Sequence, residues 1–305
     1  MTALIPFVIF LCLLPLFFLA ILLWAQPRLQ REPVTLLIKA FLWGAIAFIP
    51  FIILNWLGDL FPSIAAESLL QKSFLGYGAS LVLFLILVAI AEEGSKHVAM
   101  LKGLEESHHL IDRRLDGIIY GVSAALGFSL VDNAHYLLTS VGQFDWPSFI
   151  FFASRTLGFT MMHITASGIF GFLYATALLE DRITRHFNQP LHHFHRHFPK
   201  AFKLHIFRTH VLPKRHSTRG HEKGELVAEG LVLAIGLHVI YLLLIRFAFW
   251  DQRLTLLLVP LLILILLGML DLAKRLDQRR FTWLRRLHRF FLRLIAGKHA
   301  KIGQD

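Results

Sequence analysis

The sequence predicts an all-α protein, a polytopic transmembrane bundle of about seven helices. Three observations predict it. Hydrophobic residues make up 56% of the 305 residues, whereas a soluble domain carries about 45–50%. These residues gather into stretches of about 20, the length that crosses the hydrocarbon core of a bilayer. Basic residues gather in alternate connections between the stretches, a pattern typical of membrane proteins with a fixed orientation.

The first apolar stretch differs from a secretory signal peptide. No basic residue precedes it, and it is longer than the apolar core of a signal peptide, which has about 7–15 residues. We therefore expect a retained helix. The fourth and fifth stretches are longer than one span needs, so these helices should tilt or extend beyond the bilayer. The expected spans are Ala3–Trp24, Leu36–Leu57, Gly76–Lys96, Leu115–Val141, Ser148–Leu179, Leu226–Phe249 and Leu254–Leu272.

The charges of the connections predict the orientation. The first and third connections, the insert 180–225 and the C-terminal tail are rich in lysine and arginine, whereas the alternate connections hold few charges. By the positive-inside rule, the N-terminus lies outside and the C-terminus in the cytoplasm. We expect a transmembrane domain over residues 1–272 and a basic amphipathic tail over residues 273–305. Such a tail would lie on anionic lipid at the cytoplasmic face.

Composition narrows the chemistry further. The net charge of +11 lies in the connections and the tail without an aromatic and basic module, so anionic lipid is a better partner than nucleic acid. The single cysteine, Cys12, excludes an intrachain disulfide and a cysteine-based zinc site. The insert 180–225 is rich in histidine, and such tracts can bind metal. Its spacing matches no closed zinc site, which favours a cytoplasmic basic loop.

Two adjacent carboxylates inside the membrane are the strongest sign of function. Glu92 and Glu93 follow an uncharged apolar run, and Lys96 comes shortly after them. An ionised group in a bilayer costs about 2.5–3.5 kcal/mol even on mild insertion scales. Residues three and four apart are neighbours on a helix, so Lys96 can keep one carboxylate ionised. Repulsion between the carboxylates favours a shared proton. The pair is therefore expected to supply a metal ligand and a general base.

Further polar residues lie at similar depth in later spans. Asp132 and Asn133 follow an apolar run in the fourth span, Arg155 and His163 lie in the fifth, and His238 lies in the sixth. At about 1.5 Å per residue, Asp132, His163 and His238 lie roughly 18–25 Å into their helices, so they can meet. Carboxylate oxygen and imidazole nitrogen are ligands of zinc. We expect a divalent metal, zinc above all, on Glu92, Asp132, His163 and His238. The residues expected to serve catalysis are Glu92, Glu93, Lys96, Asn133 and Arg155.

In this order the motifs resemble those of the PrsW family of intramembrane proteases, a relative of the CAAX prenyl protease and bacteriocin-processing superfamily. The matching residues are Glu92, Glu93 and Lys96; Asp116, Gly117, Tyr120 and Gly121; Phe128, Asp132 and Asn133; His163; and His238. The resemblance covers residues 76–245, which would form the catalytic core. It implies a multi-spanning metalloprotease of the bacterial plasma membrane that hydrolyses peptide bonds of a membrane-anchored protein. The family's best-known role is the first cut of a membrane-anchored anti-sigma factor.

By this resemblance Glu92 and Glu93 activate water, and Asp132, His163 and His238 complete the site. One departure concerns Asp132, since the family commonly has glutamate at this position. Aspartate is one methylene shorter, so either the site is tighter or Asp132 supports a ligand without binding the metal itself. The histidine-rich insert 180–225 is a second departure from the family.

Other functions are compatible with the same residues. In a metal-free site, a glutamate alone would activate water, and His163 and His238 would stabilise the oxyanion. Buried carboxylates and histidines also form the proton and ion paths of transporters, although the chain has no internal repeat of the kind that many transporters show. A non-catalytic membrane scaffold is disfavoured by the intact carboxylate pair and both histidines. Stoichiometric metal in the purified protein would separate a metalloenzyme from these alternatives.

Overall fold

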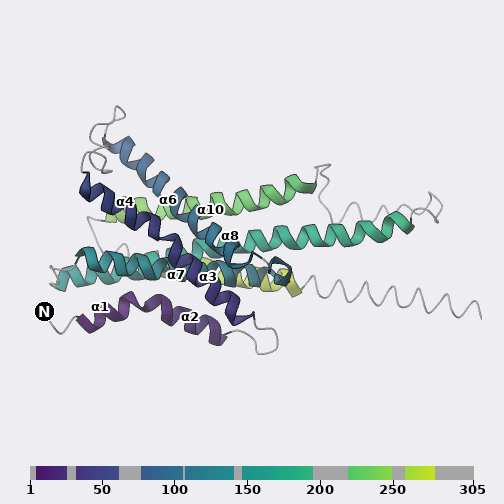
Figure 1. Ribbon diagram of the computed structural model, residues 1–305, viewed down its shortest axis with the longest axis horizontal. Coiled ribbons are helices and arrows are strands. Elements are labelled where there is room, and N and C mark those ends of the chain that lie inside the picture. The colour runs from purple at the N-terminus through teal and green to yellow at the C-terminus, as the bar shows by residue number, and fades with distance from the viewer. Residues whose placement is uncertain are drawn as a thin grey trace, which may run out of the picture.

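The protein is a bundle of long helices. The computed structural model describes residues 5–25, 32–61, 77–105, 107–140, 146–194, 219–248 and 258–278, which form helices and short turns without a strand. In chain order the helices are α1 (Ile5–Cys12), α2 (Leu14–Ala25), α3 (Val34–Ala47), α4 (Ile49–Leu60), α6 (Tyr77–Gly103), the 3₁₀ turn η2 (His108–Leu110), α7 (Arg114–Ser140), α8 (Trp146–Phe194), α10 (Arg219–Ala248) and a last helix over residues 258–278. In Figure 1, α7 and α8 lie side by side, and the α1–α2 pair runs along one edge. The predicted all-α polytopic fold is confirmed.

Five helices are long and apolar enough to cross a membrane: Val34–Leu57, Gly78–Gly103, Arg114–Thr139, Phe149–Glu180 and Gly224–Ile245. The bent pair Pro6–Cys12 and Leu14–Trp24 makes a sixth if it counts as one span. The seventh expected span, Leu254–Leu272, falls partly on the helix over residues 258–278, which is not among these candidates. Four charged residues, Asp271, Lys274, Arg275 and Asp277, lie in the last part of that helix.

Prolines mark the breaks in the first two spans. Pro50 begins α4, directly after the turn at Phe48 that separates α3 from α4. Proline lacks the N–H that an inner helical turn needs, and it fits best in the first turn. Pro15 has the same place in α2, and α1 and α2 meet at an angle of 52°. Two spans that the sequence predicts as single helices are therefore helix pairs.

Helix α6, in contrast, is longer than predicted. Its predicted span ends at Lys96, but the helix continues to Gly103. The carboxylate pair and Lys96 therefore lie within the helix, about three and about two turns before its end. A continuous helix keeps side chains three and four residues apart on one face.

Helix α7 packs between α3 and α8 at backbone distance. A Cβ atom added to Gly117 on α7 would collide with the backbone of Gly171 on α8, and the reverse is also true. A Cβ atom added to Gly127 would collide with the backbone of Phe41 on α3. Small residues permit such close helix contacts in a membrane. These contacts place the inner faces of α7 and α8 against each other and bury most of both helices.

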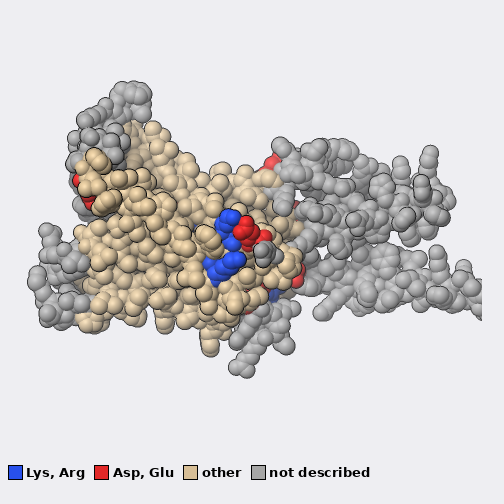
Figure 2. Space-filling view, viewed as in Figure 1, with Lys and Arg blue, Asp and Glu red and all other residues tan. Residues whose placement is uncertain are grey.

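The outer surface of the bundle is apolar. Large side chains are exposed along α6 and α10, among them Leu83, Leu87, Val232 and Ile240. In Figure 2 most of the described part of this face is uncharged; a compact group of basic and acidic residues lies near its middle, and further charged atoms lie at its edges. An exposed apolar surface of this extent is expected for helices that face lipid.

A buried polar cluster joins the start of α3 to the start of α7. We name Glu32, Arg113, Asp116 and Tyr120 the Glu32 cluster. The Tyr120 hydroxyl donates to Oε2 of Glu32 at 2.6 Å, and Arg113 Nη2 lies 2.6 Å from Asp116 Oδ1 and 3.4 Å from Glu32 Oε1. Burial raises the pKa of Glu32 to about 7, opposed by the Tyr120 hydrogen bond and assisted by the charge of Asp116. Arg113 lowers the pKa of Glu32 by a smaller amount.

The raised pKa of Glu32 predicts a pH-dependent stability. In the unfolded chain its pKa is about 4.3, so the folded state holds the proton more tightly. The stabilising contribution is therefore complete below about pH 4 and is lost as the pH rises through about 7. Glu32→Gln carries no charge at any pH and should flatten the fall in melting temperature between about pH 5 and 8.

Thermal unfolding of the purified protein in detergent, followed by tryptophan fluorescence, checks this expectation. The exposed residue Glu105 provides a matched control, because Glu105→Gln should keep the wild-type slope. A wild-type slope in Glu32→Gln would contradict the assignment.

Candidate active site

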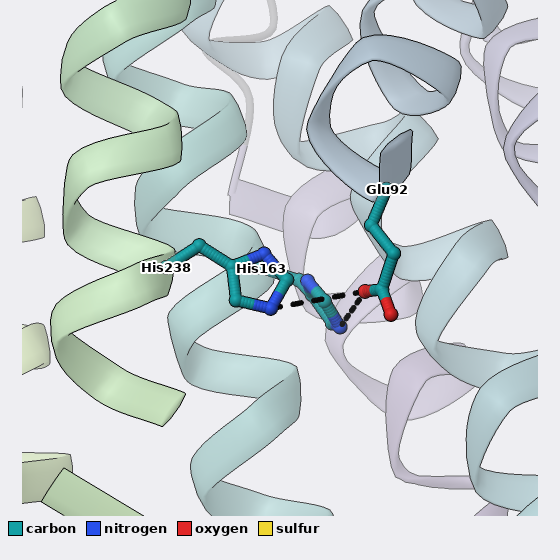
Figure 3. A group of neighbouring side chains, drawn as sticks. All are labelled: Glu92, His163 and His238. Atoms are coloured by element: carbon teal, nitrogen blue, oxygen red, sulfur yellow. Dashed lines mark ion pairs between the residues drawn. The ribbon is translucent and has the colours of Figure 1, made fainter. Parts of the chain in front are cut away.

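Three helices bring one carboxylate and two imidazoles together. Glu92 on α6, His163 on α8 and His238 on α10 each offer an atom of the kind that binds metal, and these atoms lie within 4.8 Å of one another (Figure 3). The histidines are buried, whereas 16% of the Glu92 side chain is exposed. Glu92 is therefore the member of the group that meets the surroundings of the bundle.

Both imidazoles turn the same nitrogen toward the same oxygen. Oε2 of Glu92 lies 3.9 Å from Nε2 of His163 and 3.8 Å from Nε2 of His238. These distances are too long for hydrogen bonds. Both Nε2 atoms are buried without a hydrogen-bond partner. Unpaired buried nitrogens are rare and call for an explanation such as a bound ion or a catalytic role.

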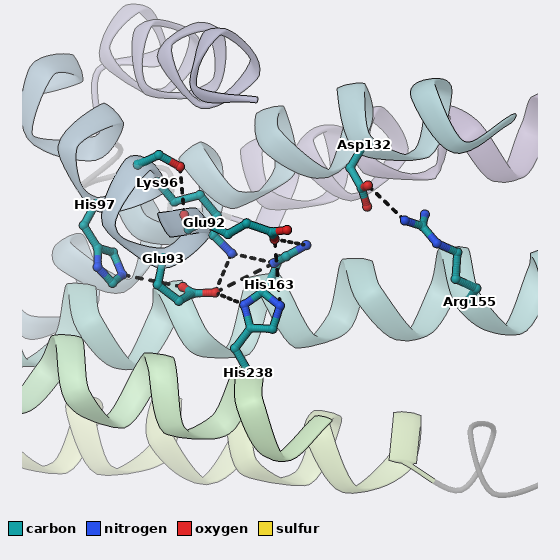
Figure 4. A network of polar contacts seen from close by, with 9 residues as sticks. Glu92, Glu93, Lys96, His97, Asp132, Arg155, His163 and His238 are labelled. Atoms are coloured by element: carbon teal, nitrogen blue, oxygen red, sulfur yellow. Dashed lines mark hydrogen bonds and ion pairs between the residues drawn. The ribbon is translucent and has the colours of Figure 1, made fainter. Parts of the chain in front are cut away.

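Glu93 and Lys96 hold the opposite edges of the two rings. Oε1 of Glu93 lies 2.6 Å from Nζ of Lys96 and 2.8 Å from Nδ1 of His238. Nζ of Lys96 also lies 2.5 Å from Nδ1 of His163 (Figure 4). Both Nδ1 atoms are thus engaged, which leaves both Nε2 atoms facing Glu92. Glu93 and Lys96 are fully buried and lie one helical turn apart, as their spacing requires.

The partners of Nδ1 distinguish the two histidines. For His238, the Nδ1 hydrogen is donated to the Glu93 carboxylate, so Nε2 keeps a free lone pair. For His163, the partner is an ammonium group, which can only donate. Nδ1 of His163 then accepts, and the neutral ring carries its hydrogen on Nε2. His238 is ready to act as a ligand, whereas His163 must first lose that hydrogen.

The group of Glu92, His163 and His238 fits a divalent metal. Zinc lies about 2.0–2.1 Å from nitrogen and 2.0–2.2 Å from carboxylate oxygen, so two ligand atoms of one ion are at most about 4.3 Å apart. Both nitrogen–oxygen distances, 3.9 and 3.8 Å, satisfy this limit, and all three atoms lie within 4.8 Å of one another, so small side-chain shifts would complete the geometry around an ion. Three protein ligands leave a further position for water or substrate. The contact between Glu93 and His238 matches the carboxylate–histidine pairs that orient metal ligands.

Aromatic side chains enclose the group. The rings of Phe128 on α7 and Phe159 on α8 lie 5.2 Å and 6.0 Å from the ring of His163. On the far side of Glu93, His97 stacks on Phe170 at 3.6 Å. These rings limit water around the buried charges and so strengthen the electrostatic interactions among them. Sequence reasoning missed His97, although its position four residues after Glu93 on the same helix was the available signal.

Three other residues predicted for the site make polar contacts outside the group of Glu92, His163 and His238. Asp132 accepts a hydrogen bond from Nη2 of Arg155 at 2.9 Å, and the Arg155 guanidinium lies 4.0 Å from the centre of the Tyr136 ring. Asn133 donates to Thr160 at 3.1 Å. Figure 4 shows Asp132 and Arg155 to one side of the carboxylates and imidazoles. Asp132, expected as a metal ligand, is not part of the three-residue group that could hold an ion in the described structure.

The profile of the PrsW family intramembrane metalloproteases matches residues 32–207, more than half of the chain. The chain belongs to the PrsW family. The matched segment includes Glu92, Glu93, Lys96 and His163, whereas His238 lies beyond its end and reaches the site on α10. Family membership and the candidate spans identify an integral membrane protein, and the bacterial relatives support the expected plasma-membrane location.

Curated relatives named "Protease PrsW" match part of the chain. The chain is 33% identical over 117 residues to the protein of Clostridioides difficile (strain 630), covering 38% of this chain and 44% of that relative. It is 26% identical over 115 residues to the protein of Bacillus subtilis (strain 168), covering 38% and 46% respectively. The chain therefore spans about half the length of these PrsW relatives. No solved structure matches the chain.

For the buried pair of Glu93 and Lys96, we expect that removing one charge destabilises the protein more than removing both. Glu93→Gln leaves the Lys96 ammonium buried without its counter-charge, which should lower the free energy of unfolding by about 3–5 kcal/mol. Adding Lys96→Met removes the second charge and should recover most of that loss. The free energy of unfolding in detergent micelles checks both variants. A double variant as unstable as Glu93→Gln alone would contradict the ion pair.

Proposed function

We propose that this chain is an intramembrane protease that hydrolyses a peptide bond of a membrane-anchored protein at Glu92, His163 and His238. One observation carries the proposal: a partly exposed carboxylate faces two buried, unpaired imidazole nitrogens inside candidate membrane spans. Peptide hydrolysis needs a group that takes a proton from water and groups that stabilise the developing oxyanion. Membership in the PrsW family supports this assignment over a transporter or a scaffold.

In this proposal the two adjacent carboxylates have different roles. Glu92 is the general base, because its side chain is partly exposed. Its Oε2 atom faces the unpaired nitrogens and would bind a metal, which leaves the second carboxylate oxygen to take the proton from water. Glu93 has one oxygen shared by Lys96 and His238 on the opposite edge of the rings, so it positions the imidazoles and does not meet substrate. Lys96 keeps Glu93 ionised and fixes the orientation of His163.

We propose zinc as the metal, held by Glu92, His163 and His238. A divalent metal supplies Lewis acidity, which lowers the pKa of water and polarises a carbonyl group. The donor set of one carboxylate and two imidazoles supports zinc, as does the carboxylate that orients His238. Asp132 pairs with Arg155 and is left out of this ligand set.

A metal-free variant of the same site has one observation in its favour. The Lys96 ammonium donates to Nδ1 of His163, so the ring presents an Nε2 hydrogen toward Glu92. That hydrogen could stabilise an oxyanion directly. The metal content of the purified protein separates the two versions, because only the first requires a stoichiometric ion.

We also propose the membrane arrangement that the charge pattern predicts, with about seven spans, an outside N-terminus and the core over residues 76–245. The domain 1–272 contains the basic insert 180–225, and the tail 273–305 follows it. Residues 195–218 of the insert and 279–305 of the tail lie outside the described residues. Their expected contacts, with the cytoplasm and with anionic lipid, stay predictions. Cleavage of an anti-sigma factor stays a prediction from the family resemblance.

Replacing Glu92 by glutamine tests the proposed base. Glutamine keeps the shape of glutamate but cannot take a proton, so the cleavage rate should fall by about 10²–10⁴. The assay uses the full chain in proteoliposomes with a fluorogenic single-span reporter peptide. Glu105→Gln is the matched control at an exposed glutamate and should cleave at the wild-type rate. Equal rates for wild type and Glu92→Gln would rule out the role of Glu92.

Cysteine labelling tests the orientation. With Cys12 replaced, single cysteines at positions 63 and 140 should react with an impermeant reagent added outside intact cells, and a cysteine at position 217 should not. The reason is the excess of lysine and arginine in the insert 180–225. Labelling of position 217 from outside would overturn the arrangement.

A further inference from the structure

We propose that Asp132 and Arg155 form a binding station for the backbone of the substrate, beside the catalytic group. The inference rests on the proposed function, because it names how that site would hold a polypeptide. It gives Asp132 and Arg155 a role in substrate binding in place of metal binding or chemistry.

The first observation is an unused donor next to an unused acceptor. Oδ1 of Asp132 accepts from Nη2 of Arg155 at 2.9 Å. The remaining atoms of the pair, Oδ2 of Asp132 and Nη1 of Arg155, are buried and have no hydrogen-bond partner. An ion pair whose only role were to join two helices would be expected to satisfy these atoms as well, because unpaired buried polar atoms are destabilising.

The unused atoms indicate the chemical class of the ligand. The carboxylate and guanidinium neutralise each other, so a charged ligand would be repelled by one of them. The backbone of one residue in an extended chain is neutral and presents one N–H donor and one C=O acceptor on the same side. Its N–H can donate to Asp132, and its C=O can accept from Arg155. The pair is therefore complementary to polypeptide backbone in any sequence.

A protease inside a membrane has a specific need for such groups. A spanning helix must unwind near the cut bond, and its freed N–H and C=O groups find no water in the bilayer. Further buried polar atoms without partners lie near the pair in the sequence of α7 and α8, at Ser129, Asn133 and Thr156. They could accept or donate additional hydrogen bonds to an unwound segment.

The station is rigid and lies within reach of the catalytic group. The Arg155 guanidinium lies 4.0 Å from the centre of the Tyr136 ring and 4.7 Å from that of Phe159, which fixes its plane. Arg155 precedes His163 by eight residues on α8, a rise of about 12 Å. An extended chain covers that distance with about three or four residues. We therefore expect the station to bind the substrate three or four residues from the cut bond.

The competing explanation is a purely structural ion pair. A buried ion pair can often be replaced by apolar residues of similar size without loss of stability. The double variant Asp132→Leu, Arg155→Met should then fold normally and bind substrate normally if the pair only joins α7 to α8. If the pair is a binding station, the same variant folds but binds substrate poorly.

The test measures binding in the absence of cleavage. The full chain carries Glu92→Gln and is placed in lipid nanodiscs. The probe is a synthetic span of about 20 leucine and alanine residues, interrupted by two glycines and labelled with a dansyl group that accepts energy from tryptophan. Loss of two hydrogen bonds should raise the Kd of the double variant about tenfold. The matched control removes the ion pair Arg114–Asp277, whose nitrogen–oxygen distance is 3.3 Å, and should leave Kd unchanged.

A second series of probes replaces single amides around the glycines by esters, which removes one N–H at a time. One ester position should weaken binding to the Glu92→Gln parent and have no effect on the double variant, because Asp132 is the missing acceptor. Equal Kd values for the parent and the double variant, no binding of any probe to the parent, or an ester effect that persists in the double variant would each overturn the station. If binding behaves as expected and the wild-type chain leaves the probe uncut, the proposed hydrolysis fails and the station stands.

Discussion

The buried charge of Glu93 is the interaction on which the rest of the site depends. Its Oε1 atom holds Lys96 at 2.6 Å and His238 at 2.8 Å, and Lys96 in turn contacts His163. An isolated carboxylate at this depth would be costly. Because Glu93 is paired with an ammonium and an imidazole N–H, it orients both rings, one directly and the other through Lys96. The unpaired Nε2 atoms face Glu92 because Nδ1 of each ring is engaged from the opposite edge.

The fold supplies this arrangement from three distant segments. Helix α7 lies between α3 and α8 because glycines at 117, 127 and 171 allow the helices to approach at backbone distance. Helix α8 carries His163, and α6 and α10 place Glu93 and His238 beside it. The outer faces of α6 and α10 are apolar and suited to lipid. A polar site inside an apolar bundle follows from this division between inner and outer helix faces.

Much of the fold could be predicted from hydropathy and charge, since both depend on local sequence. The breaks at Pro15 and Pro50 were also predictable in principle, because proline weakens an inner helical turn and favours the first turn of a new helix. The continuation of α6 to Gly103 was not, because Lys96 reads as the end of an apolar span although Glu93 neutralises it. The seventh span stays a prediction that no candidate in the described residues supports.

The candidate site could be predicted as a set of residues but not as an arrangement. Similar depth in the membrane predicted that Asp132, His163 and His238 lie close together. The rotation of each helix about its axis decides which side chains meet, and that rotation depends on packing with neighbouring helices. It turns Glu92 toward the unpaired nitrogens and Glu93 toward Lys96 and Nδ1 of His238, and it pairs Asp132 with Arg155. His238 lies outside the segment that the family profile matches, and tertiary structure alone brings it to Glu92.

The central claim is that Glu92, His163 and His238 converge on one metal ion. X-ray absorption spectroscopy at the zinc edge of the purified full chain tests it most directly. The account predicts one zinc per chain with nitrogen and oxygen ligands at about 2.0–2.2 Å, including the scattering pattern of two imidazoles, and loss of one imidazole in either His163→Asn or His238→Asn. A chain without stoichiometric metal, or an imidazole count unchanged in both variants, would contradict it.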